Sequence, residues 1–198
     1  MNIHMNDLER RLNKLEDKIK QPNFRQNRGL GNEVGYYVFD YPAEQELLVR
    51  ERVNYLVSKY ENSNQDFRLV VFDLYDIIID LLIKEGFIEL CYEFEKNKGF
   101  SEITKAVNEM LRMEEDNLSN EILAHISNNT PEDSIVFLTG VGKCFPILRS
   151  HKILNNLHQF VDHVPVVMLF PGKYDGQSLI LFSEIKDDNY YRAFKLVD

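Results

Sequence analysis

The first patterned segment of the chain is a helix with a narrow apolar face. Over residues 5–20 the apolar positions are separated by steps of four, three and four residues, and charged side chains fill most positions between them. This spacing predicts an amphipathic helix. Its apolar seam consists of Leu8, Leu12, Leu15 and Ile19. About two heptads are too few for an independent coiled coil. Two interpretations therefore stay open: the helix docks on its own domain, or it pairs with a second copy or with a partner protein.

A segment without periodicity follows this helix. Pro22 and the glycines at positions 29, 31 and 35 interrupt any apolar pattern, which is typical of a linker. A chain of 198 residues is close to the size of one domain. We therefore predict an N-terminal helical segment at residues 1–21, a linker at 22–35 and a single α/β domain at 36–198.

Beyond the linker, strand and helix patterns alternate. Strands are predicted at residues 36–39, 68–72, 134–138, 164–170 and 190–197, and helices at 43–60, 74–82, 87–96, 101–126 and 147–160. Residues 178–185 are predicted as a short helix, with a buried strand as the alternative. The run at 134–138 is almost continuously apolar, which is typical of a central strand buried on both faces of a parallel sheet.

The repeated order of strand and helix predicts the fold class. It is a three-layer α/β fold with a mostly parallel sheet and helices on both faces, Rossmann-like or P-loop-like, with the amphipathic helix added at the N-terminus. Folds of this class place their sites at the carboxyl ends of the strands. Asp40 and Asp73 follow two of the predicted strands. Each is a candidate helix cap or, as the alternative, an acidic ligand of the Walker B kind.

A glycine-rich turn follows the strand at 134–138, where phosphate-binding loops occur. Its candidate ligand residues are Thr139, Gly140, Gly142 and Lys143. The full P-loop pattern requires a glycine where Phe137 stands and a hydroxyl, as a magnesium ligand, where Cys144 stands. Nucleotide hydrolysis is therefore not expected. A sensor or enzyme that binds a nucleotide or phosphate at this turn stays an alternative function.

Composition narrows the classes of ligand, partner and compartment that this chain could have. The net charge of −9 argues against direct binding to DNA, which requires clustered Lys and Arg. Cys91 and Cys144 lack the spacing of a zinc site or disulfide framework, and the histidines form no known ligand motif, so we expect no metal and no cofactor. No apolar run approaches the ~20 residues that span a bilayer, and no signal-peptide core is evident. We expect a cytoplasmic protein without a membrane segment and without enzymatic activity.

Two polar segments near the C-terminus are candidate partner surfaces. Tyrosine and arginine are enriched at protein interfaces. The candidate anchors are Tyr174, Asp175, Tyr190, Tyr191 and Arg192. The alternative for these tyrosines is burial in a terminal strand.

Several long strings resemble the BrxB family of bacterial BREX phage-defence systems. The most specific are FLTGVGKCFPILRSHKILNNL at residues 137–157 and FPGKYDGQSLILFSEIKDDNYYRAFKLV at residues 170–197. YYVFDYPAEQELLVRERV at 36–53 and FDLYDIIIDLLIKEG at 72–86 are similar in order and character. The resemblance therefore covers almost everything after the linker.

The resemblance implies a small component of a BREX operon. Such a component works beside a methyltransferase, a large ATPase and a PglZ-type, phosphatase-like protein, and the family carries no catalytic residues that can be transferred to this chain. The leading hypothesis is a non-catalytic adaptor or scaffold that binds the PglZ-type protein. A homodimer through the N-terminal helix is a further possibility.

Overall fold

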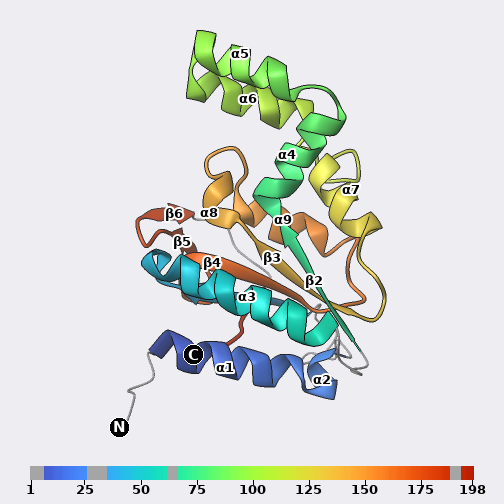
Figure 1. The fold of residues 1–198 in the computed structure, drawn as a ribbon, viewed down its shortest axis with the longest axis vertical. Coiled ribbons are helices and arrows are strands. Elements are labelled where there is room, and N and C mark those ends of the chain that lie inside the picture. Colours follow the sequence, from blue (N-terminus) through green and yellow to red (C-terminus); the bar gives the residue numbers. More distant parts are fainter. Residues whose placement is uncertain (1–6, 26–34, 62–66, 188–192) are drawn as a thin grey trace.

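The centre of the protein is a parallel β-sheet (Figure 1). The computed structural model describes residues 7–25, 35–61, 67–187 and 193–198. In spatial order the parallel strands are β2 (Arg68–Asp73), β3 (Ser134–Thr139), β4 (Val166–Tyr174), β1 (Tyr36–Tyr41) and β7 (Phe194–Lys195). Strands β5 (Leu179–Leu181) and β6 (Ile185–Asp187) extend the end of β4 as an antiparallel ribbon. The predicted mostly parallel sheet is confirmed.

Helices cover both faces of the sheet, which confirms the three-layer α/β fold. One face carries α1 (Asp7–Ile19), α2 (Pro22–Arg25) and α3 (Glu46–Glu61), which follows a 3-10 turn at Ala43–Gln45. The other carries α4 (Leu74–Lys84), α7 (Glu121–Asn128), α8 (Val141–Cys144) and α9 (Ser150–Leu157). The side chains of β3 alternate between the two layers: Val136 and Leu138 pack with the second group, and Ile135 and Phe137 with the first. The apolar run at 134–138 is therefore an interior strand, although the middle of the sheet belongs to β4.

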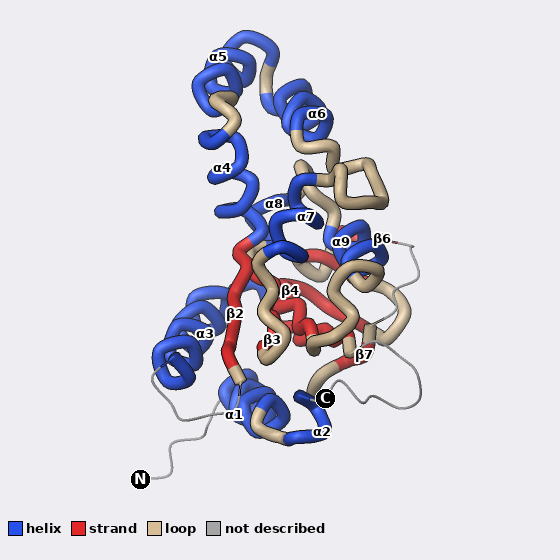
Figure 2. Tube along the Cα trace, turned by 90° about the vertical axis from the view of Figure 1, so that its right-hand side faces the viewer, coloured by secondary structure: helices blue, strands red, loops and turns tan. Residues whose placement is uncertain are grey.

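A helical hairpin extends away from these layers. Helices α5 (Ile88–Lys98) and α6 (Phe100–Met110) continue from the end of α4 and stand clear of the sheet in both views (Figures 1 and 2). Cys91, Ile103 and Val107 are buried within it. We call residues 88–110 the arm.

The N-terminal helix docks on its own domain. Its four seam side chains, Leu8, Leu12, Leu15 and Ile19, are at most 3% exposed and belong to the apolar cluster between α3 and the sheet. Glu16 extends this contact, because its carboxylate accepts hydrogen bonds from Lys59 and Tyr60. The interpretation of the seam as a partner or dimer interface is corrected accordingly, since these side chains already lie inside the chain's own core.

Three predicted segments differ from the structure. The predicted linker begins with the one-turn helix α2, whose Phe24 is buried; residues 26–34 lie outside the described part. The helix predicted at 101–126 is two helices, because the Asn120 side chain caps α7 and also donates to the carbonyls of Met113 and Glu115. The helix predicted at 178–185 is the β5–β6 ribbon, because pairing with β4 overrides local propensity.

Candidate functional site

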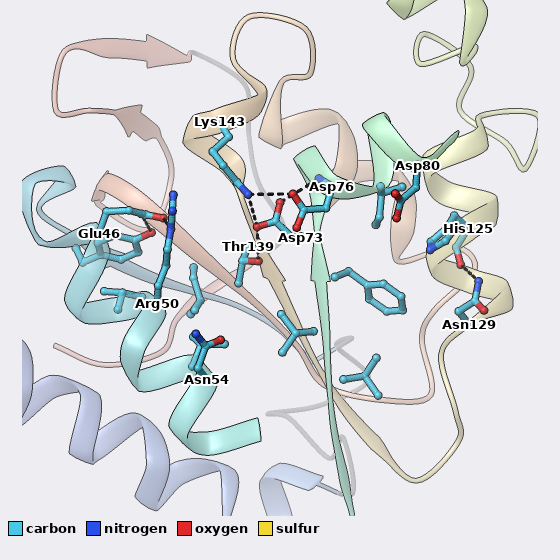
Figure 3. Close-up of a pocket in the computed structure, with 18 residues that line it drawn as sticks. Glu46, Arg50, Asn54, Asp73, Asp76, Asp80, His125, Asn129, Thr139 and Lys143 are labelled. Atoms are coloured by element: carbon cyan, nitrogen blue, oxygen red, sulfur yellow. Dashed lines mark hydrogen bonds and ion pairs between the residues drawn. The ribbon is translucent and has the colours of Figure 1, made fainter. Parts of the chain in front are cut away.

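A cleft of about 750 Å³ opens where β2 and β3 end, between α3 and α4 (Figure 3). This is the edge of a parallel sheet at which α/β folds place their sites. Side chains from α3, α4 and α7, from the end of β2 and from the end of β3 with the turn that follows it reach this cleft. Its polar lining comprises Glu46, Arg50 and Asn54 of α3, Asp73 after β2, Asp76 and Asp80 of α4, His125 and Asn129 of α7, and Thr139 and Lys143 near the end of β3.

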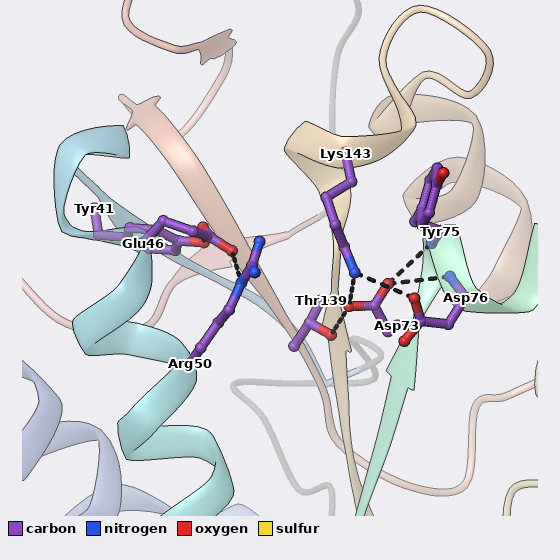
Figure 4. A network of polar contacts seen from close by, with 8 residues as sticks. All are labelled: Tyr41, Glu46, Arg50, Asp73, Tyr75, Asp76, Thr139 and Lys143. Atoms are coloured by element: carbon purple, nitrogen blue, oxygen red, sulfur yellow. Dashed lines mark hydrogen bonds and ion pairs between the residues drawn. The ribbon is translucent and has the colours of Figure 1, made fainter.

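Lys143 lies at the centre of the polar contacts in this cleft (Figure 4). Its Nζ is 2.7 Å from Asp73 Oδ2 and 3.3 Å from Asp76 Oδ1, and it also lies over the ring of Tyr75. Burial alone would lower the pKa of Lys143, but the hydrogen bonds and negative charges of Asp73 and Asp76 outweigh it and raise that pKa. The ammonium group is therefore charged and held by two carboxylates of the chain itself.

Asp73 organises the turn that follows β3. Its Oδ1 accepts hydrogen bonds from the backbone N–H groups of Tyr75 (3.1 Å) and Asp76 (3.2 Å), which caps α4. Its Oδ2 accepts a hydrogen bond from Thr139 Oγ1 at 3.3 Å. Of its two predicted roles, Asp73 therefore fills that of the helix cap.

Close packing explains why glycines stand at positions 140 and 142 of this turn. A Cβ at Gly140 would lie 2.2 Å from Asp73 Oδ1, and Gly140 has a φ of +75°, which favours glycine. A Cβ at Gly142 would lie 2.9 Å from Phe182 Cε1. The structure thus brings Thr139, Gly140 and Lys143 together around a carboxylate. An anion at this turn would have to displace Asp73 and Asp76 from Lys143.

A second polar contact lies across the cleft on α3. Arg50 Nε donates to Glu46 Oε1 at 2.8 Å, and Tyr41 Oη donates to Glu46 Oε2 at 2.5 Å. Burial, together with the hydrogen bond to Glu46, raises the pKa of Tyr41 well above its usual range. Both cations of the cleft are thus matched by carboxylates, whereas Asp80 is exposed and has no ion-pair or hydrogen-bond partner among the described residues. Four carboxylates and two cations leave the cleft acidic.

The thiols lack the features of nucleophiles. Cys144 is buried, and burial raises the pKa of its thiol to about 12. Cys91 is buried within the arm, and burial raises its pKa as well. Within the described ranges, no three His, Cys, Asp or Glu side chains are placed to share a metal ion. The described helices include none long and apolar enough to cross a bilayer.

Of the predicted C-terminal anchors, the structure describes Tyr174 and Asp175, and these two differ in exposure. Tyr174 is buried, and its Oη donates to the carbonyl of Ala193 at 2.6 Å, so its prediction as an exposed anchor is wrong and the alternative of burial holds. Asp175 is exposed and accepts hydrogen bonds from the backbone N–H groups of Gln177 and Ser178. Tyr190, Tyr191 and Arg192 lie outside the described residues.

Asp40 has a role that the sequence pattern did not reveal. It does not cap a helix, because the turn after β1 begins at Pro42 without a side-chain cap. Asp40 instead accepts hydrogen bonds from Arg11 at 2.7 Å and from the backbone N–H of Tyr174 at 3.0 Å, and it lies 3.3 Å from Lys195 Nζ. These partners are distant in sequence, so only an accurate prediction of the packing of α1 and β7 could have found them.

Comparison with known proteins gives consistent results along the chain. The family model described as "BREX protein BrxB" matches residues 70–196. A relative with the same description from Bacillus cereus (strain H3081.97) is 46% identical over 194 residues, which cover 98% of this chain and 100% of the relative. Another, from Escherichia coli O9:H4 (strain HS), is 33% identical over 190 residues, which cover 96% of this chain and 92% of the relative. No solved structure matches.

Proposed function

Because this chain belongs to the BREX protein BrxB family, and hence to a phage-defence system, we propose that it is a non-catalytic adaptor or scaffold of a BREX complex. Its direct partner in this proposal is the PglZ-type protein of the same operon, and the complex assembles in the cytoplasm. The family membership supports the assignment of this chain to a BREX phage-defence system. The adaptor role and the partner are the proposal.

The observation that carries the proposal is the arm. It stands clear of the sheet (Figures 1 and 2) and carries Leu90, Tyr92 and Phe100, which are 49%, 60% and 52% exposed. Burying such apolar surface against a partner contributes about 25 cal/mol per Å². Aromatic side chains on a projecting element are typical anchors of a protein interface. The arm is therefore suited to hold another protein away from the body of the chain.

The contacts in the cleft agree with this proposal. Lys143 and Arg50, the cations that could attract a phosphate, are held by Asp73, Asp76 and Glu46 of the same chain. Binding an anion would require these ion pairs to break and would leave carboxylates facing the ligand. The polar groups thus serve to fix α3, α4 and the turn after β3 in place.

Co-purification tests the proposal. The full chain is co-expressed with the PglZ-type protein of its operon, and the complex is measured by size-exclusion chromatography with light scattering and by calorimetry. We expect association at micromolar concentration or tighter. The absence of association at that concentration would remove the adaptor proposal.

Calorimetry separates this proposal from the alternative of a nucleotide-binding sensor or enzyme. The purified chain is titrated with ATP, and then with GTP, in the presence of Mg²⁺, and Lys143→Ala serves as the comparison. The adaptor proposal predicts no heat of nucleotide binding, either with the wild type or with Lys143→Ala. Heat that is present in the wild type and lost in Lys143→Ala would favour the alternative instead.

A further inference from the structure

Strand β2 has one free edge. It lies at the end of the sheet and pairs only with β3 among the described strands. The backbone N–H of Arg68 points toward β3, because it donates to the carbonyl of Asp133 at 2.9 Å. Backbone groups alternate in direction along a strand, so the N–H and C=O groups of Leu69 and Val71 point away from β3. They have no hydrogen-bond partner within the described part of the chain.

The cleft runs along this free edge. Val70, Val71 and Phe72 of β2 line it, with α3 on one side and α4 and α7 on the other (Figure 3). Val71 packs toward the α3 layer, whereas Phe72 belongs to the layer of α4 and α7. The cleft therefore reaches both faces of the sheet around its outermost strand, which is the space that one further strand would occupy.

We propose that the free edge of β2 receives one extended segment of the partner protein, which adds a strand to the sheet. This inference rests on the proposed adaptor function and specifies how the partner is held. The outward groups of Leu69 and Val71 supply the donors and acceptors for such pairing. An added strand lies about 4.8 Å from its neighbour. A helix, with a diameter of about 10 Å, requires a wider groove and leaves those groups unpaired.

The charge of the cleft favours a single segment over a second copy of this chain. The free edge lies between α3 and the pair α4 and α7, in a cleft with four carboxylates and two cations. Two copies paired through β2 would bring two acidic clefts together, and like charges across an interface oppose association. A lone extended segment enters without that conflict.

The lining also defines the chemistry of the segment. On the α3 side the cleft is lined by Val49 and Val53 beside the paired Glu46 and Arg50, and on the α4 side by Asp76, which is shared with Lys143, and by the exposed Asp80. Successive side chains of a strand face opposite sides. The segment that fits alternates apolar residues, directed at α3, with Lys or Arg, directed at α4. The excess of carboxylates over cations in the cleft attracts such a segment.

Hydrogen exchange on the co-purified complex with the PglZ-type protein tests the proposal. We expect amide exchange at residues 69 and 71 to slow by at least about tenfold in the complex. The amides of the interior strand β3 serve as the internal reference. A complex that forms with unchanged exchange in β2 overturns the strand-addition proposal and leaves the adaptor proposal standing. If no complex forms, both proposals fall.

Two substitutions at one position separate backbone pairing from side-chain contact. Val71→Pro removes the outward N–H at a place where an edge strand tolerates proline, and Val71→Ala keeps the N–H while shortening the side chain. We expect Val71→Pro to weaken partner affinity by at least about tenfold and Val71→Ala by less than about threefold. Equal losses overturn the proposal. Circular dichroism checks that both variants fold, and if Val71→Pro does not, exchange in the wild-type complex decides.

Discussion

The guanidinium of Arg11 in α1 donates to Oδ1 of Asp40 at the end of β1 across 2.7 Å, and both side chains are only about one-tenth exposed. Asp40 also accepts the backbone N–H of Tyr174 in β4 and lies 3.3 Å from Lys195 in β7. One carboxylate thus joins the N-terminal helix to three neighbouring strands. The docking of α1 is part of the fold and not an attachment to it.

Substitution of this carboxylate tests its role in stability. Asp40→Asn keeps the size of the side chain but leaves Arg11 buried without its counter-charge. We expect the free energy of unfolding to fall by about 3 kcal/mol, as measured by urea denaturation. The control is Asp17→Asn, at an exposed position of α1, the helix that carries Arg11. It should change the free energy of unfolding by less than about 0.5 kcal/mol. Equal effects of the two variants would contradict the structural role of Asp40.

The apolar seam of α1 gives a second stability prediction. Leu15 is among the most deeply buried side chains, so Leu15→Ala leaves a cavity and should cost about 2–5 kcal/mol in the free energy of unfolding. Leu47→Ala, at a leucine on α3 that is 71% exposed, should cost less than about 0.5 kcal/mol. If Leu15→Ala instead left stability unchanged and weakened partner binding, the seam would be an interface after all.

The sequence predicted the layers of the fold well, because a run of apolar residues indicates a buried segment. Residues 134–138 were predicted as a strand buried on both faces, and β3 has one neighbour on each side and helices above and below. Pairing between distant segments left no such signal. The ribbon at β5 and β6 depends on pairing with the end of β4, whereas the pattern of residues 178–185 alone favours a helix over a strand.

The candidate site, like the fold, could be predicted from the sequence only in part. The sequence located the turn at Thr139 to Lys143 at the correct edge of the sheet, because a glycine-rich turn after a buried strand marks that place. It could not reveal that Asp73, distant in sequence, occupies the position beside Gly140 and Lys143. The free edge of β2 was missed too, since edge position depends on strand order, which local periodicity does not encode.

The ionisation of Glu16 should make stability depend on pH. Burial of this carboxyl opposes its charge, but hydrogen bonds from Lys59 and Lys20 outweigh burial and lower the pKa of Glu16 from 4.5 to about 2. A lowered folded-state pKa contributes stability that is fully present above the unfolded-state value and is lost as the pH falls through the folded-state value. We therefore expect the stability advantage of the wild type over Glu16→Gln to shrink between pH 4.5 and about 2.

Urea denaturation at several pH values measures this dependence. Glu51→Gln, at an exposed position of α3, provides the control for loss of one carboxylate. A difference between the wild type and Glu16→Gln that stays constant across this range would show that the contact with Lys59 and Lys20 does not influence the ionisation of Glu16.

Two glycines separate steric conflict from backbone strain in the turn after β3. Gly140 and Gly86 have nearly the same φ, +75° and +74°, but only Gly140 has an atom within 4 Å of an added Cβ, namely Asp73 Oδ1. Gly86→Ala should therefore cost about 1 kcal/mol from strain alone. Gly140→Ala should cost at least about 2 kcal/mol, because Asp73 must also move away from its hydrogen bonds. Equal losses in thermal unfolding would show that Asp73 is not fixed beside Gly140.

The arm provides the prediction that bears most directly on the adaptor proposal. Leu90 and Tyr92 are 49% and 60% exposed, so their truncation removes little packing within the chain. The double variant Leu90→Ala and Tyr92→Ala should keep its free energy of unfolding within about 1 kcal/mol of the wild type. If these side chains anchor the PglZ-type protein, the same variant should weaken its affinity by at least about tenfold, because interface energy is concentrated in a few apolar and aromatic side chains.

The matched control for the arm is Leu47→Ala, which removes a still more exposed leucine from α3. Calorimetry of each variant with the partner compares the affinities, and urea denaturation of each variant alone compares the stabilities. A loss of affinity confined to the arm variant supports the arm as the partner surface. Unchanged affinity in the arm variant, with the complex still formed, moves the interface elsewhere, and hydrogen exchange along β2 then shows whether the free sheet edge alone holds the partner.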